Sequence, residues 1–208
     1  MVRPQRVMTA EEMARTLTRM AHQILEAAAG GPEIAFVGVH TRGAPLAKRL
    51  ADRIAAAGSP RPPVGMLDIN LYRDDLTRVS SAPLLRATSI PFDIDRRTVV
   101  LVDDVLHTGR TVRAALDALS DFGRPARVQL AAFIDRSGRE LPIQPDVVGR
   151  RLEAPAGSSV EVRLSEIDGV PDEVVVIQPT APKRKSAPPV GKPTGALRRK
   201  ARPKRGRR

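Results

Sequence analysis

Apolar side chains near the start of the chain follow a helical pattern. Residues 9–29 carry them three or four positions apart, which predicts an amphipathic helix. Thr9 and Glu12 have the spacing of a capping box at its start. The apolar positions of this helix are Met13, Leu17, Met20, Ile24 and Ala28.

Farther along, the apolar residues come in continuous runs instead. Such short runs are typical of strands that are buried on both faces. They span 34–39, 97–105 and 126–136, and a strand-like stretch covers 64–72. Helical patterns follow two of these strands, at 44–58 and 110–123, and we expect Gly123 to end the second helix. Its inward positions are expected to be Val112, Ala115, Leu116, Leu119 and Phe122.

The order of these elements, α–β–α–β–loop–β–α–β, predicts an α/β fold with a mostly parallel sheet and helices on both faces. Residues 73–94 are polar and irregular, which is typical of a functional lid loop. Residues 137–178 contain two or three shorter strands, and the last is "EVVVI".

Charge divides the chain into two parts. The formal net charge is +12, but residues 181–208 contain 12 Lys or Arg and no acid, so 35 − 12 = 23 basic residues remain against 23 acidic ones. We therefore expect a folded domain over 1–180 and a disordered, basic, Pro- and Gly-rich tail over 181–208. The tail either assists contact with RNA or DNA or is an extension without a defined role.

The sequence lacks three features that would indicate disulfides, secretion or a membrane span. There is no cysteine, so disulfides and thiolate metal sites are excluded. We find no signal-peptide pattern and no apolar run near the roughly 20 residues that a membrane span needs. These observations predict a soluble, cytoplasmic protein.

The stretch "LVDDVLHTGRT" (101–111) carries the first candidate site. Asp103 and Asp104 come where a strand is expected to end, and 108–111 is where a helix is expected to begin. Free N–H groups at a helix start bind anions, while carboxylates accept hydrogen bonds from vicinal hydroxyls. One turn could therefore bind a phosphorylated sugar at both ends. The alternative is an acidic turn that only stabilises the helix dipole.

A second strand–helix turn, "HTRG" (40–43), has the same chemistry in a weaker form. Its backbone N–H groups, Thr41 and Arg42 could bind another anion. A glycine-containing turn with one arginine is common, so this reading depends on the first site. Neither a P-loop nor a dinucleotide fingerprint is present.

The stretch "VVLVDDVLHTGRT" resembles the phosphoribosyl-pyrophosphate (PRPP) signature of the type I phosphoribosyltransferases. Together with "VGVHTRGAPLAKRLADRI", "DINLYRDDL", "FGRPARVQLAAFIDR" and "RELPIQPDVVG", it resembles the PyrR family over about residues 9–178. That family comprises regulators of pyrimidine operons with uracil phosphoribosyltransferase activity. The resemblance implies a type I phosphoribosyltransferase fold with a small hood and a flexible lid.

The resemblance also implies roles for individual residues. Asp103 and Asp104 would bind the ribose hydroxyls, and Arg42 and Thr41 the diphosphate. Arg73, Asp74 and Asp75 would belong to the lid. The expected contacts to PRPP or UMP, with Mg²⁺ carried by PRPP rather than by a dedicated protein cage, are Thr41, Arg42, Asp103, Asp104, Val105, Leu106, His107, Thr108, Gly109, Arg110, Thr111, Arg136 and Val160.

The family's second function is binding of pyrimidine leader mRNA in response to UMP or UTP. Arg15, Arg19 and Thr41 are the candidate RNA contacts, and a homodimer or larger homo-oligomer is implied. Two departures from the family pattern are His107, where Tyr is usual, and Gly138, where His is common. Two alternatives stay open, an RNA regulator with weak or lost catalysis and a salvage enzyme without RNA regulation.

Overall fold

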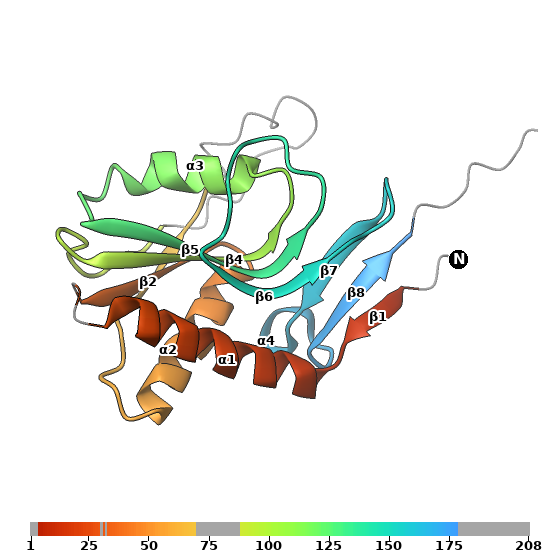
Figure 1. The fold of residues 1–208 in the computed structure, drawn as a ribbon, viewed down its shortest axis with the longest axis horizontal. Helices are drawn as coiled ribbons and strands as arrows, with labels where there is room; N and C mark the ends of the chain where they lie inside the picture. The colour runs from red at the N-terminus through yellow and green to blue at the C-terminus, as the bar shows by residue number, and fades with distance from the viewer. Residues whose placement is uncertain (1–3, 30, 32, 70–87, 179–208) are drawn as a thin grey trace, which may run out of the picture.

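Five parallel strands form the central sheet of the computed structural model, which describes residues 4–29, 31, 33–69 and 88–178 (Figure 1). The strand order is β3-β2-β4-β5-β6. The strands are β2 (Ile34–Val39), β3 (Val64–Leu67), β4 (Thr98–Leu106), β5 (Arg127–Arg136) and β6 (Val147–Leu152). Because β3 and β4 lie on opposite sides of β2, the order of the chain reverses beside β2. The predicted parallel sheet is confirmed, although β3 is shorter than predicted.

Helices cover both faces of this sheet, as predicted. Helices α1 (Ala10–Ala28) and α2 (Gly43–Ala56) lie on one face, and α3 (Arg110–Leu119) lies on the other (Figure 1). Alternate strand residues fill two cores: Phe36 and Phe133 pack in the core with α1 and α2, whereas Val37 and Leu101 pack in the core with α3. This division follows from the two-residue period of a strand.

The start of α1 agrees closely with the sequence pattern. The hydroxyl of Thr9 accepts a hydrogen bond from the Glu12 N–H (3.3 Å), and the Glu12 carboxylate accepts one from the Thr9 N–H (2.8 Å). This reciprocal pair is the predicted capping box. Among the described helices, none is long and apolar enough to cross a membrane.

Helix α3 differs from its prediction at its C-terminal end. It ends at Leu119, so Phe122 and Gly123 lie beyond it, and Ser120 caps it. Leu116 and Phe122 were predicted to point inward but are 40% and 44% exposed. Val112, Ala115 and Leu119 are buried as predicted, and Ala114 and Ala118 complete the buried face of the helix.

A second, smaller sheet lies beside β6 and β4 in the fold (Figure 1). It is antiparallel, with the order β1-β8-β7, and comprises β1 (Gln5–Met8), β7 (Ser159–Arg163) and β8 (Glu173–Ile177). The short helix α4 (Ser165–Asp168) connects β7 to β8. Strand β1 and helix α4 were not predicted, because β1 is short and polar and pairs with the far end of the chain.

Candidate active site

The turns 40–43 and 103–111 lie at the same edge of the central sheet. They follow β2 and β4, which are neighbours at the reversal of strand order, where open α/β sheets bind ligands. Gly38 pairs with Val102, so the two strands reach this edge together. Gly43 packs so closely on β4 that a Cβ there would overlap the Val102 carbonyl oxygen. The glycine therefore permits the two turns to approach each other.

Asp103 and Asp104 lie in the last part of β4, as the predicted strand over 97–105 implied. The strand continues to Leu106, because its pairing with β5 extends from Asp103 opposite Ala132 to Leu106 opposite Asp135. Asp103 is only 4% exposed, and its carboxylate accepts a hydrogen bond from the Asp104 N–H (3.0 Å). Burial raises the pKa of the half-buried Asp104, and the Arg42 charge opposes that rise. Sheet pairing therefore holds in place the main chain that carries both carboxylates.

The backbone at the start of α3 is held in a defined conformation. Gly109 precedes the helix at φ +93°, a left-handed conformation that favours glycine. A Cβ there would lie 3.3 Å from the Cβ of Leu141. The Thr108 carbonyl accepts hydrogen bonds from the N–H groups of Glu140 and Leu141, both 3.0 Å. The loop after β5 thus packs on this turn and fixes its shape.

Side chains of the turn 105–111 differ in where they lie. Arg110 pairs with Glu140 (2.7 Å) and is exposed, whereas Thr111 is half-buried in the first turn of α3. The imidazole of His107 occupies the space beside Gly138, where a Cβ would lie 2.7 Å from its Nε2. Burial, and then the charge of Arg136, lower the pKa of His107. The histidine is therefore neutral at pH 7, and it leaves no room for a side chain at Gly138.

Arg136 connects the central sheet to the smaller one. Its side chain is buried at the end of β5, and Nη1 donates to the Ser158 carbonyl (3.0 Å), two residues before Val160. Its Nε is also buried and has no hydrogen-bond partner within the described residues. A hollow of about 280 Å³ lies between Arg136, Gly138 and Leu152. The structure therefore brings Arg136 and the Val160 segment together beside the turn 105–111.

Thr41 and Arg42 form the second turn. The His40–Thr41 peptide bond is cis, and the Thr41 hydroxyl lies 2.9 Å from His40 Nδ1. The guanidinium of Arg42 pairs with Asp168 of α4 through Nη2 (2.7 Å) and Nε (3.4 Å). The hydrogen bonds from Arg42 to Asp168 raise the pKa of Arg42. Asp168 was missed from the sequence, where it is one acid in a short polar stretch.

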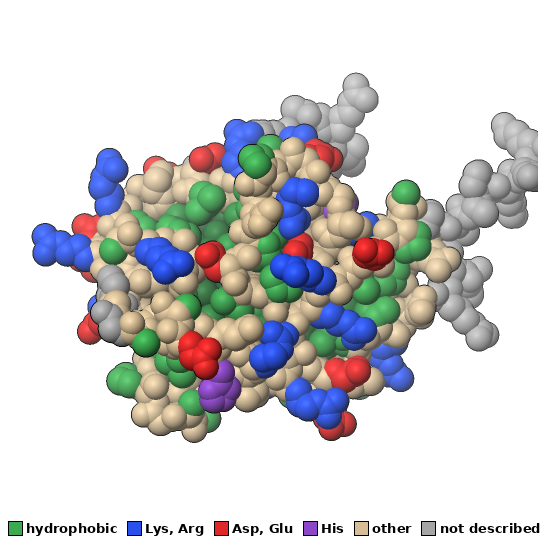
Figure 2. Space-filling view, in the orientation of Figure 1, with side chains coloured by type: hydrophobic (Ala, Val, Ile, Leu, Met, Phe, Trp, Pro, Cys, Tyr) green, Lys and Arg blue, Asp and Glu red, His purple; other side chains and the backbone are tan. Residues whose placement is uncertain are grey.

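The other predicted residues lie elsewhere or cannot be placed. Arg73, Asp74 and Asp75 of the predicted lid fall outside the described residues. Arg15 is exposed and pairs with Glu11 (2.6 Å), while Arg19 donates to the carbonyls of Val148 and Gly149 on the edge strand β6. A groove of about 300 Å³ runs beside both arginines, and basic side chains are spread over this face (Figure 2). Thr41 lies apart from them, at the carboxyl edge of the sheet.

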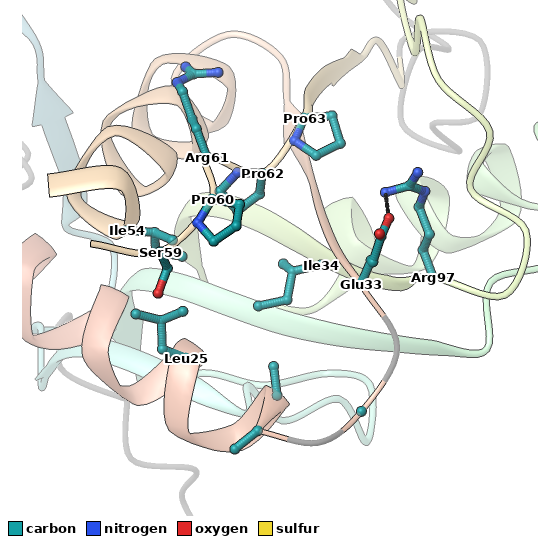
Figure 3. A pocket seen from close by; sticks show the side chains of 13 residues that line it. Leu25, Glu33, Ile34, Ile54, Ser59, Pro60, Arg61, Pro62, Pro63 and Arg97 are labelled. Atoms are coloured by element: carbon teal, nitrogen blue, oxygen red, sulfur yellow. Dashed lines mark ion pairs between the residues drawn. The ribbon is translucent and has the colours of Figure 1, made fainter. Parts of the chain in front are cut away.

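Another pocket, of about 420 Å³, lies at the opposite edge of the sheet (Figure 3). Its lining includes Ile34 at the start of β2, Pro63 just before β3 and Arg97 just before β4. Glu33 and Arg97 form an ion pair there (2.8 Å). These are the amino ends of the strands, so this pocket is separate from the two turns.

Comparison with protein families identifies the class to which this fold and site belong. A model of the phosphoribosyl transferase domain matches residues 6–163, which include both turns. The hypoxanthine phosphoribosyltransferase of Trypanosoma cruzi superposes with a TM-score of 0.63 at 18% identity, over 85% of this chain and 97% of that one. The hypoxanthine phosphoribosyltransferase of Staphylococcus aureus superposes with a TM-score of 0.57 at 17% identity, over 72% of this chain and 77% of that one. The chain has the phosphoribosyltransferase fold that the sequence implied.

Closer relatives narrow the family. The bifunctional protein PyrR of Roseiflexus sp. (strain RS-1) is 54% identical over 175 residues, 84% of this chain and 96% of the relative. The bifunctional protein PyrR of Thermus aquaticus is 53% identical over 163 residues, which are 78% of this chain and 90% of the relative. The chain belongs to the PyrR family, which confirms the resemblance found in its motifs.

Proposed function

We propose that the protein is a uracil phosphoribosyltransferase, which converts uracil and PRPP to UMP and diphosphate, and that it also regulates pyrimidine genes through leader mRNA. One observation carries the enzymatic part: two strand–helix turns meet at the carboxyl edge of the sheet beside the carboxylates of Asp103 and Asp104. Membership of the PyrR family supports both parts.

Each part of PRPP has a complementary group. Asp103 and Asp104 accept hydrogen bonds from the two ribose hydroxyls. The N–H groups over 105–111, at the start of α3, bind the 5′-phosphate, since a helix N-terminus favours an anion. Thr41 and Arg42 bind the diphosphate. Arg136, whose buried Nε has no hydrogen-bond partner in the part of the chain that the structure describes, and the Val160 segment enclose the uracil.

Breaking the bond from ribose C1 to the diphosphate leaves positive charge on the sugar. Asp104 stabilises that charge, and Arg42 neutralises the leaving diphosphate, so catalysis depends mainly on positioning and electrostatics. Mg²⁺ bound with PRPP would supply further charge neutralisation at the diphosphate, and the carboxylate oxygens of Asp103 and Asp104 would suit this ion. The segment with Arg73, Asp74 and Asp75 closes over the site to exclude water.

The direct test is UMP formation from uracil, PRPP and Mg²⁺, with orotate, hypoxanthine and xanthine as parallel substrates. Turnover selective for uracil is the expected result. Turnover of another base instead would overturn the substrate assignment. Absence of turnover by folded protein that still binds UMP would favour the RNA regulator without catalysis.

RNA binding is the second function. A uridine nucleotide that favours the RNA-binding form would couple the pyrimidine supply to gene expression. Arg15 and Arg19 on α1 are the proposed RNA contacts, together with Thr41 beside the proposed nucleotide site. Binding of the pyrimidine leader RNA by the full chain and by residues 1–180 tests this proposal. If only the tail binds, affinity should be lost on truncation, show little sequence preference and fall steeply with salt.

A further inference from the structure

Helix α2 contacts the segment between β7 and β8 through two arginines. Arg42 and Arg49 are seven residues apart, which places them on the same face of the helix. Arg42 pairs with Asp168 (2.7 Å), and Arg49 pairs with both Glu166 and Asp172 (2.5 Å each). The two arginines differ in position: Arg42 is at the carboxyl edge of the sheet beside Asp104, and Arg49 is two turns away from it.

Asp168 is itself held in a defined orientation. Its Oδ2 accepts a hydrogen bond from the Leu164 N–H (2.8 Å), and its own N–H donates to the Leu164 carbonyl (2.7 Å). Burial acts against ionisation, but the hydrogen bonds from Arg42 and from the Leu164 N–H lower the pKa of Asp168. The carboxylate is therefore charged and fixed at neutral pH.

The pairing uses only part of the Arg42 guanidinium. Nε and Nη2 donate to the two oxygens of Asp168, whereas Nη1 makes no hydrogen bond within the described residues. Two parallel hydrogen bonds to one carboxylate fix the plane of a guanidinium. The free Nη1 is then presented in one direction rather than many.

We propose that Asp168 is a positioning residue for ribosyl transfer, which fixes the Arg42 guanidinium so that Nη1 binds the diphosphate of PRPP. This inference rests on the diphosphate-binding role proposed for Arg42. Asp168 thus comes from α4, the connection between two strands of the smaller sheet, and lies 126 residues after Arg42 in the sequence. Its effect should be confined to ligands that carry a diphosphate.

Electrostatics gives a reason why the pairing matters. The charge of Asp104 also acts on Arg42. Without Asp168, Arg42 would be drawn towards Asp104, which is needed as an acceptor for a ribose hydroxyl. Asp168 therefore leaves Arg42 available to the diphosphate and Asp104 available to the ribose hydroxyl.

The test compares Asp168→Asn with Glu166→Gln in the full chain. Glu166→Gln removes an acid of the same short helix, one that pairs with Arg49, so it controls for loss of contact between α2 and α4. We would measure binding of Mg²⁺-diphosphate and of UMP by calorimetry, KM for PRPP, and kcat. Asp168→Asn should weaken diphosphate binding and raise the KM for PRPP about tenfold, with UMP affinity unchanged. Glu166→Gln should change each value less than about twofold.

A coupling experiment separates positioning from a general structural role. In an Arg42→Gln background, Asp168→Asn should have no further effect on diphosphate binding, because there is no guanidinium left to orient. Equal or tighter diphosphate binding by Asp168→Asn, an equal loss in Glu166→Gln, or additive effects in the double variant would each overturn the proposal. Diphosphate binding is measured without uracil, so it decides this inference even if ribosyl transfer to uracil is not found.

Discussion

The two turns of the active site are built in different ways. The turn 103–111 is fixed by backbone: sheet pairing extends to Leu106, the Thr108 carbonyl accepts two main-chain hydrogen bonds, and Gly109 takes a left-handed conformation. The turn 40–43 depends on side chains, since Arg42 is paired with Asp168.

This difference determines which substitutions each turn can accept. Backbone N–H donors keep their positions when a neighbouring side chain changes. The turn 103–111 can therefore carry His107 where Tyr is usual in the family. A guanidinium has many rotamers, and its position depends on a partner. Substitutions in the turn 103–111 should therefore have the largest effects at its carboxylates and its glycine. In the turn 40–43 they should have the largest effects at the ion pair.

The largest effect is expected at the carboxylates. Asp104→Asn removes the negative charge next to the developing cation, so kcat should fall about 100- to 1,000-fold. The melting temperature should change little. Asp117→Asn, at an exposed acid of α3, is the control and should retain full activity. Near-normal turnover by Asp104→Asn would refute its proposed role.

A smaller and more selective loss is expected in the other turn. Arg42→Gln should lower kcat/KM for PRPP about 10- to 100-fold, the value of a charge-assisted hydrogen bond. UMP has no diphosphate, so its affinity, measured by calorimetry, should not change. Equal losses for PRPP and UMP would show that the two turns do not have separate ligands.

The glycine of the first turn gives a test of backbone construction. Gly109→Ala should lower the free energy of unfolding by about 1–2 kcal/mol, because an L-residue is strained at φ +93°. It should also weaken UMP binding, since Leu141 is 3.3 Å from the added Cβ. Gly58→Ala is the matched control: its φ is +86° with no atom within 4 Å, so it should lose stability but retain UMP affinity.

The smallest effect is expected at His107. Its pKa in the folded protein lies below the ordinary value, so the unfolded chain binds more protons near pH 6. Stability should therefore fall as the pH drops from 7.5 to 5.5, and His107→Asn should reduce that fall. Melting curves at the two pH values measure it, with the exposed His22→Asn as control. An unchanged difference would show that His107 does not contribute.

Local patterns in the sequence were enough for most elements and for marking both turns as candidate sites, while the roles of the residues in those turns remain predictions. The capping box of α1, the buried strand over 34–39 and the glycines of the turns are short-range features, since each depends on residues a few positions apart. Motif matches over most of the chain were enough to predict the family to which it belongs. The extent of the tail, the lid residues and the RNA contacts remain predictions.

Tertiary structure alone decided the features that join distant segments. Pairing with β5 carries β4 one residue beyond the predicted end of the strand, to Leu106, and holds Asp103 and Asp104 within it. The pairing of β1 with β8 and the contact between Arg42 and Asp168 each join parts of the chain more than 120 residues apart. No local propensity encodes such contacts, because they form only when the folded chain brings the distant segments together.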